Sequence, residues 1–519
     1  MDPERDLIQA AKVGDLNTVE ELVQRKLIRY INISFIAAAQ NGHLGIVKYL
    51  LNNGARINAK TNTNDTALIR ASDKGYFDIV KYLVENKANV NIKGIDGNTA
   101  LMNAASEGYL LIVKYLFEHG AKLNIQNDDN RTALLLALEN KHSNIANYLI
   151  SNKADVNLTD EYGKTALMIA AWDGYFDVVH NLIRHGAEIN TEDSLEYTAL
   201  SYAASHGHTE IVNYLINHGA KDVNLAFIKA AESGNIKTVE YFVKRKVNLN
   251  FQDTQGKTAI IAASMYGHLV IVEYLVNMGA NVNLREKNGN TALMEAAKSS
   301  LDLVKYLINQ KVPINSQDDN GWTALMYASS VDELDIVKYL ISQNADINLK
   351  NENGETALII AANWGYLRIV EYLVENNANV NVKDNSGKTA LMFAVSNHLH
   401  VVKYLIEQGA DINIQDSEGN TALMYAAVAY NLNIVKCLVD YGARVNLENY
   451  SGKNALWYVI ERDYYKIVKY LLQYYYPKDQ IENLLRFVYN TRIRTELEEY
   501  LIQKLLISQE DLKILSRLS

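Results

Sequence analysis

The chain has 519 residues, 48% of them apolar and 21% charged, so it carries enough apolar surface to fold and is too long for one conventional core. Its net charge of −9 argues against a nucleic-acid partner, because phosphate binding relies on lysine and arginine. The single cysteine, Cys437, excludes an intramolecular disulfide and a cysteine-based zinc site.

A helix pair is expected near the N-terminus, from Asp6 to Val23. It lacks the turn residues that precede later pairs and begins with polar residues, as a terminal capping unit should. The same stretch has no apolar core and is not a secretory signal. No apolar run reaches the roughly 18 residues of a membrane span. We therefore assign residues 1–31 to a capping repeat and expect a cytoplasmic protein.

A period of 33 residues organises the chain beyond this cap. Its marker is the triplet Thr-Ala-Leu, whose threonines are 32 or 33 residues apart in neighbouring regular units. These threonines are Thr66, Thr99, Thr132, Thr165, Thr198, Thr258, Thr291, Thr323, Thr356, Thr389 and Thr421, with isoleucine in place of leucine after Thr258. Asn454 takes the place of threonine in the last copy. A fixed period of this length predicts a repeat solenoid.

One unit, residues 96–124, illustrates the expected structure. It opens with the turn residues Asp-Gly-Asn, and Thr99 follows at the position of a helix N-cap. A short first helix should end at Gly108. A second helix should bury Ile112, Val113, Leu116 and Phe117. Such a pair cannot bury its apolar face alone and must stack on its neighbours, and the regular turn breaks exclude a coiled coil.

The unit resembles the ankyrin repeat, whose pattern runs D-x-x-G-x-T-P-L-H-x-A-A-x-x-G-H and then I-V-x-x-L-L-x-x-G-A-x-V-N. The likeness recurs from about residue 5 to residue 476, and the family's Pro-Leu-His usually reads Ala-Leu-Met or Ala-Leu-Ile here. The resemblance implies an all-α repeat solenoid of paired antiparallel helices with β-hairpin loops. We expect about fifteen units and a C-terminal helical cap.

Two units are shorter than the others: Gly14 to Gly42 is 28 residues and Gly207 to Gly234 is 27. In both, we expect a shortened hairpin before the helix pair, at residues 32–35 and 224–227. The array is therefore divided into a first ankyrin block, 32–221, an irregular repeat, 222–250, and a second ankyrin block, 251–476. The irregular repeat is expected to be a weak seam with a gap in the row of hairpin tips.

The tail, residues 477–519, departs from the repeat. Its apolar residues recur at helical spacing: Leu484, Leu485 and Val488, then Leu497, Leu501 and Leu505. We expect two or three helices that cover the last repeat, or that dock a partner.

The sequence offers little chemistry for a catalyst. It has no Gly-rich phosphate loop and no calcium loop with its final glutamate. The pairs His206/His208 and His398/His400 suggest a metal, but His208 stands where the ankyrin Gly-His loop has its own histidine, which favours packing. Cys437 replaces the recurrent tyrosine of the second helix and is expected to pack. We therefore predict no enzyme activity, no cofactor and no metal.

In ankyrin proteins, contacts usually come from the hairpin tips and from the two variable residues after Ala-Ala in the first helix. Here these positions carry large aromatic residues with polar neighbours, which are typical binding anchors. The candidate partner-binding residues are Trp172, Asp173, Tyr197, His206, Met265, Tyr266, Trp322, Val331, Asn363 and Trp364, with Tyr162, Leu195 and Tyr450 at further hairpin positions. The alternative is that each side chain packs against its own neighbouring repeat.

Tyrosines also recur at one phase of the second helix, from Tyr49 and Tyr82 to Tyr404. We interpret them as a structural ladder on the convex side. Phosphorylation or stacking of nucleic-acid bases are the alternatives.

These features predict a non-enzymatic scaffold or adaptor, monomeric, that binds a protein partner on its concave face and hairpin tips. The richness in Asn, Ile, Lys and Tyr is typical of an AT-rich genome, and the Thr-Ala-Leu-Met-Tyr-Ala version resembles bacterial ankyrin proteins. An alternative is therefore a secreted effector of an intracellular bacterium or virus, delivered to a host cytosol. An enzyme or a nucleic-acid binder is the alternative of another class.

Overall fold

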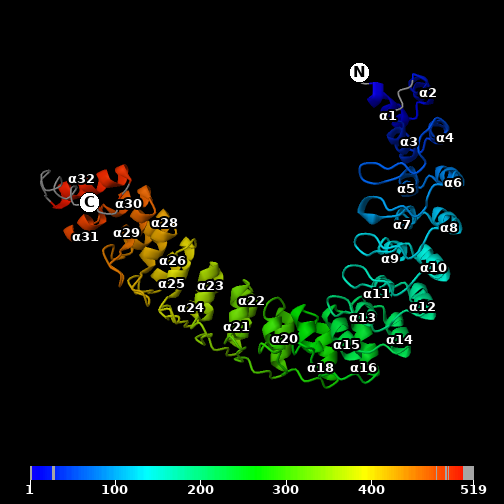
Figure 1. Ribbon diagram of the computed structural model, residues 1–519. Helices are drawn as coiled ribbons and strands as arrows, with labels where there is room; N and C mark the ends of the chain where they lie inside the picture. The colour runs from blue at the N-terminus through cyan, green and yellow to red at the C-terminus, as the bar shows by residue number, and fades with distance from the viewer. Residues whose placement is uncertain (1–2, 26–29, 475, 486–487, 489, 506–519) are drawn as a thin grey trace. The chain divides into compact units, whose positions relative to one another are not determined.

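The computed structural model describes residues 3–25, 30–474, 476–485, 488 and 490–505. These residues contain the helices α1 to α32 and one short 3-10 helix, η1 (Ile95–Gly97) (Figure 1). Helices α1 to α30 form fifteen consecutive pairs, which confirms the expected number of helix pairs.

The helices have these bounds. The first helices of the pairs are α1 (Pro3–Val13), α3 (Ile31–Gln40), α5 (Ala67–Asp73), α7 (Ala100–Ser106), α9 (Ala133–Glu139), α11 (Ala166–Asp173), α13 (Ala199–Ser205), α15 (Val223–Glu232), α17 (Ala259–Met265), α19 (Ala292–Ala296), α21 (Ala324–Ser330), α23 (Ala357–Trp364), α25 (Ala390–Ala394), α27 (Ala422–Val428) and α29 (Ala455–Glu461). The second helices are α2 (Leu16–Gln24), α4 (Leu44–Asn52), α6 (Phe77–Glu85), α8 (Leu110–Glu118), α10 (Ser143–Ser151), α12 (Phe176–Arg184), α14 (Thr209–Asn217), α16 (Ile236–Lys244), α18 (Leu269–Asn277), α20 (Leu301–Asn309), α22 (Leu334–Ser342), α24 (Leu367–Glu375), α26 (Leu399–Glu407), α28 (Leu432–Asp440) and α30 (Tyr465–Leu471).

The chain divides into two compact units between Asn248 and Leu249. In the first unit, the first helices α1 to α15 stack on one another, and the second helices α2 to α16 form a second row. The second unit repeats this arrangement with α17 to α29 and α18 to α30. Each unit is therefore an all-α repeat solenoid, as the 33-residue period predicts.

A threonine begins the first helix of a regular repeat. Its side-chain oxygen accepts a hydrogen bond from the backbone N–H three residues later, at 3.3 Å for Thr66 and 3.2 Å for Thr165. This bond satisfies one of the N–H groups that a helix leaves free at its start. In the repeat of Thr99, the thioether of Met102 accepts the threonine's own backbone N–H at 3.3 Å. The methionine of Ala-Leu-Met therefore also helps to cap the helix.

An aspartate or asparagine side chain organises the loop before most of these threonines. The Oδ1 atom of Asp318, for example, accepts the backbone N–H groups of Asn320 at 2.9 Å and Trp322 at 2.8 Å. These N–H groups are then unavailable to a strand ladder. Within the described residues, β-pairing is limited to isolated bridges at 159–165 and 285–291, so the expected β-hairpin loops are mostly turns held by side chains.

The recurrent asparagine at the end of the loop joins neighbouring repeats in most of the array. Asn157 accepts the backbone N–H of Glu188 at 2.9 Å and donates to the carbonyl of Gly186 at 3.1 Å. Asn91 makes the same pair of bonds with Lys122 and Gly120. A single side chain thus satisfies a donor and an acceptor of the next loop.

The placement of a shortened hairpin at 32–35 and 224–227 is wrong, although the connection before the second of these helices is short, since α14 ends at Asn217 and α15 begins at Val223. Both stretches lie inside the first helix, and α3 and α15 are ten residues long, longer than most other first helices. Neither unit has the Asp-x-x-Gly turn, and Phe35 and Phe227 are fully buried at helical positions. The first helix of these units therefore begins about one turn earlier than the first helix of a regular repeat. The division at 222–250 as a weak seam stays a prediction.

The second helices bury the expected stripe, as Ile112, Val113 and Leu116 show in α8. Phe117 was expected to be buried with them, but it is only half-buried. Its ring packs edge-on against Tyr148 of the next repeat, with 6.2 Å between ring centroids. The residue therefore contacts a neighbouring repeat at the edge of the core.

Two helices follow the last pair, α31 (Lys478–Leu485) and α32 (Thr491–Leu505). The expected apolar residues Leu484, Leu485, Val488, Leu497 and Leu501 are buried. The side chain of Leu505 and all of 506–519 lie outside the described residues. Helix α32 packs on α30, where the hydroxyl of Tyr465 donates to Glu496 at 2.6 Å.

Candidate functional site

Trp172 is the centre of an aromatic cluster at the end of α11. Its side chain is half-exposed, at 43%. Its ring lies 4.1 Å from that of His206 and 5.1 Å from that of Tyr202, both from the next repeat. The ammonium of Lys164 lies 5.5 Å from the indole centroid and 5.6 Å from that of Tyr202, within the range of a cation–π interaction. We call Lys164, Trp172, Tyr202 and His206 the Trp172 cluster.

Tyr202 is fixed from behind by the loop of its own repeat. Its hydroxyl donates to the buried carboxylate of Asp193, and burial together with this bond raises the pKa of Tyr202 well above its usual value. The ring of Tyr197 lies 5.2 Å from that of Tyr202. Lys229 places its ammonium 4.6 Å from the Tyr197 ring and 3.0 Å from Glu232. The aromatic surface is therefore held on several sides.

A cavity of about 310 Å³ opens beside this cluster. Its lining residues are Glu139, Lys141, Lys164, Met168, Ile169, Trp172, Asp173 and Tyr202. Glu139 pairs with Arg131 at 3.1 Å, and burial raises the pKa of the Glu139 carboxyl. The cavity thus combines an aromatic wall with both signs of charge, and it includes Asp173 of the predicted set.

The candidates of the second unit lie on separate repeats. Tyr266 follows α17 and is 57% exposed, with its ring 6.2 Å from that of His268, and Met265 beside it is half-buried. Val331 follows α21 and is exposed. Asn363 and Trp364 end α23, and Trp364 is 57% exposed with no aromatic or cationic partner among the described residues.

Trp322 differs from the other tryptophans of the predicted set. It is half-buried, and its ring lies 5.1 Å from that of Tyr327 in its own repeat. The hydroxyl of Tyr327 in turn donates to Asp318 at 2.6 Å, and the ammonium of Lys298 lies 4.6 Å from the centroid of the Tyr327 ring. Packing, the alternative weighed for each candidate, therefore fits Trp322 better than Trp172 or Trp364.

The structure brings Trp172, Tyr197 and His206 together around Tyr202, a residue that the sequence interpretation missed. The same arrangement recurs at Tyr327 and at Tyr425, which donates to Asp416 at 2.6 Å with Lys388 4.9 Å from its ring. In each case the loop aspartate precedes the tyrosine by nine residues. That spacing is a signal available in the sequence, whereas the lysine comes from another repeat.

The hairpin candidates Tyr162, Leu195 and Tyr450 are exposed at the loops. On the second helices, the tyrosine ladder is half-buried, and lysines of the preceding repeat lie over its rings, as with Lys48 at 5.5 Å from Tyr82. These contacts are those of a structural ladder.

His208 and His398 join repeats. Nε2 of His208 lies 2.9 Å from the backbone oxygen of Trp172, and Nε2 of His398 lies 3.2 Å from that of Asn363. The His208 ring also packs under Gly174, whose φ of 80° favours glycine and where a Cβ would lie 2.5 Å from the ring. The described residues hold no cluster of metal-ligating side chains. Cys437 is buried, and burial raises the pKa of its thiol.

No helix in the described part of the chain has both the length and the apolar character needed to cross a membrane. A search of curated proteins found no match to the chain. A family model that describes three consecutive ankyrin repeats matches the chain in successive, partly overlapping stretches. These are residues 7–94, 91–160, 152–226, 221–286, 271–351, 334–416 and 408–482. These matches extend over almost the whole array of helix pairs, with its threonine caps and its inter-repeat asparagines. The chain therefore belongs to the ankyrin repeat family.

Proposed function

We propose that this chain is a scaffold that binds a protein partner through exposed side chains at the ends of its first helices, centred in the first unit on the Trp172 cluster. Ankyrin repeats are generally protein–protein interaction modules, and proteins built from them are typically non-enzymatic binding scaffolds. The observation that carries the proposal is the half-exposed indole of Trp172 beside a cavity of about 310 Å³.

The physical argument is preorganisation. A large aromatic side chain gains most on binding when its rotamer is already set, because little conformational entropy is then lost. The rings of His206 and Tyr202 and the ammonium of Lys164 restrict the indole of Trp172 in this way. The part that stays exposed is free to contact a partner. Exposed aromatic anchors with such support are the usual hot spots of protein interfaces.

Trp364 and Tyr266 are proposed as further anchors in the second unit, because both are more than half exposed. Trp322 is proposed as a supporting residue that packs on Tyr327. The proposal does not extend to delivery into a host cell, for which the sequence offers only its composition and its version of the repeat.

The test captures proteins with three versions of the full chain: the unchanged chain, the Trp172→Ala variant and the Leu111→Ala variant as the control. The amount of each captured protein is measured by mass spectrometry. Leu111 is an exposed apolar residue on the second helix α8, outside the proposed surface. A partner that depends on Trp172 should bind at least tenfold more weakly to Trp172→Ala, since an anchor contributes about 2 kcal/mol or more. Equal capture by all three chains would refute the proposed surface.

A further inference from the structure

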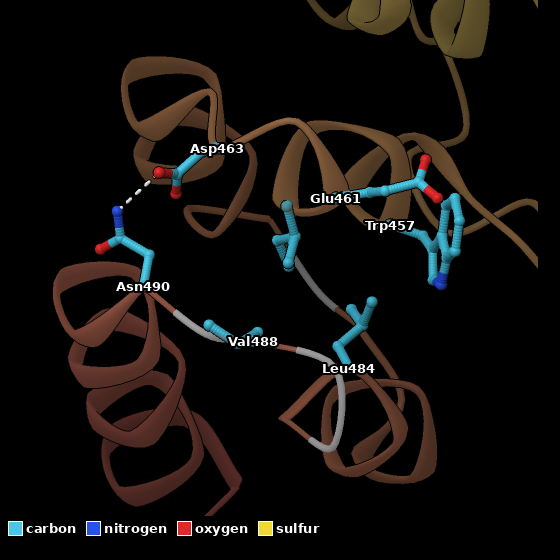
Figure 2. A pocket seen from close by; sticks show the side chains of 7 residues that line it. Trp457, Glu461, Asp463, Leu484, Val488 and Asn490 are labelled. Atoms are coloured by element: carbon cyan, nitrogen blue, oxygen red, sulfur yellow. Dashed lines mark hydrogen bonds between the residues drawn. The ribbon is translucent and has the colours of Figure 1, made fainter.

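Two adjoining cavities lie where the C-terminal helices meet the last repeat. The first, of about 400 Å³, is lined by Trp457, Ile460, Glu461, Asp463, Leu484, Val488 and Asn490 (Figure 2). The second, of about 520 Å³, is lined by Glu448, Ser451, Gly452, Lys453, Asn454, Trp457, Gln480, Asn483 and Leu484. Their sizes fall within the range of ligand-binding pockets. Trp457 and Leu484 line both cavities.

The first cavity has an apolar floor and acidic ends. Ile460, Leu484 and Val488 are buried side chains that supply the floor. Both charged residues that line it, Glu461 and Asp463, are carboxylates. The Asp463 carboxylate is held by the side-chain amide of Asn490 at 2.8 Å, whereas Glu461 is exposed (Figure 2).

The indole of Trp457 already attracts one cation. The ammonium of Lys453 lies 3.3 Å from its ring centroid, and Lys453 lines only the second cavity. Glu461 lines only the first cavity and lies four residues after Trp457 on α29, so the two side chains are neighbours on the helix surface. The wall of the first cavity is therefore an aromatic ring with an adjacent carboxylate.

We propose that the first cavity binds an arginine side chain of a protein partner. The aliphatic stem of arginine suits the floor of Ile460, Leu484 and Val488, and its guanidinium can lie against Trp457 while it pairs with Glu461. A planar guanidinium stacks on aromatic rings and pairs with carboxylates in a fixed geometry, which a lysine ammonium does not do. The site uses other residues than the Trp172 cluster and stands independently of the proposed function.

Charge complementarity decides between occupants. A basic side chain with an apolar stem satisfies both the floor and the carboxylates of the first cavity. A purely apolar side chain would leave Glu461 beside it with no counter-charge, and an acidic one would be repelled by Glu461 and Asp463. In the second cavity, Lys453 and Asn483 offer polar groups to the backbone of the same peptide.

The test uses the full chain and a matched set of short fluorescein-labelled peptides that differ only in a central arginine, lysine or citrulline between leucines. Binding is measured by fluorescence anisotropy. The arginine peptide should bind most tightly, and citrulline, which keeps the shape and loses the charge, should bind about tenfold more weakly. Glu461→Gln should weaken the arginine peptide about fivefold, as a part-exposed ion pair does, and leave the citrulline peptide unchanged.

The matched control is Glu375→Gln, which removes the same charge from an exposed residue at the end of α24 and should change neither peptide. Trp457→Leu should weaken the arginine peptide as well, with thermal unfolding as a check on the C-terminal helices. Because Glu461 is exposed, the Glu461→Gln variant should fold normally, and its affinity for the arginine peptide is therefore the decisive measurement. Equal affinity for arginine and citrulline, no response to Glu461→Gln, or no binding up to about 1 mM peptide, a free energy near −4 kcal/mol, would overturn the proposal.

Discussion

Tyr327→Phe removes one hydroxyl from the support of Trp322 and leaves the ring in place. In the folded chain this hydroxyl donates to the carboxylate of Asp318 at 2.6 Å and lies 3.1 Å from Oδ1 of Asn290 in the preceding repeat. Asp318 is buried and also holds the backbone N–H groups of Asn320 and Trp322. The substitution therefore weakens the point at which the loop, the first helix and the candidate residue Trp322 meet.

The expected loss follows from the kind of bond. A hydrogen bond to a charged group contributes about 1.5–3 kcal/mol, so we expect Tyr327→Phe to destabilise this loop by about 2 kcal/mol. Local opening then becomes about 30-fold more frequent, since 1.4 kcal/mol corresponds to a factor of ten. The backbone amide of Trp322, which donates to Asp318 at 2.8 Å, reports on this opening directly.

Hydrogen exchange followed by mass spectrometry on peptides that contain residues 318–327 measures the effect. The control is Tyr266→Phe, because Tyr266 is 57% exposed and follows α17, two repeats before the repeat of Tyr327. A surface substitution of this kind should change stability by less than about 0.5 kcal/mol. Unchanged exchange at Trp322 in Tyr327→Phe, or an equal effect of Tyr266→Phe, would refute the idea that the Asp–Tyr bond holds the loop.

Limited proteolysis is expected to cut first within 222–250, where the Asp-x-x-Gly loop between repeats is missing, and first cuts inside a regular repeat would contradict this. A chain that ends at residue 477 is expected to aggregate or fray at its last helix pair on gel filtration, because an apolar face is uncovered, while an equally stable monomer would make the tail a docking motif. Burial raises the pKa values of Tyr202, Tyr327 and Tyr425, so the folded chain keeps phenol protons that the unfolded chain releases near pH 10, and its stability should fall as the pH rises from there. Replacing all three tyrosines by phenylalanine should make the free energy of unfolding, measured by urea titration, fall less steeply between about pH 9 and 11. An unchanged slope would contradict the assignment of this decline to the three phenols.

The repeat array was predictable because its signals are local. A threonine caps the helix that starts beside it, and a glycine ends that helix a few residues later, so neither needs a distant partner. The period of Thr-Ala-Leu then repeats these local events often enough to define the solenoid. The fifteen helix pairs follow from that pattern, whereas the buried leucines of α31 and α32 follow from a separate helical spacing in the tail.

The candidate surface depended on contacts between residues about thirty positions apart. The sequence proposes Trp172 and Trp322 alike as binding residues, yet only the tertiary structure separates a half-exposed indole from one packed on Tyr327. The lysines over the rings of Tyr202 and Tyr327 come from the preceding repeats, and no local pattern pairs them.

The cavity at Trp457 also required the tertiary structure. Its walls come from α29 and from the C-terminal helices, which share no period with the repeat. The repeat pattern determined that helices stack, because each pair must cover the apolar face of the next. Which side chains remain outside that stack, and what charge they carry beside one another, was decided only when distant segments packed together.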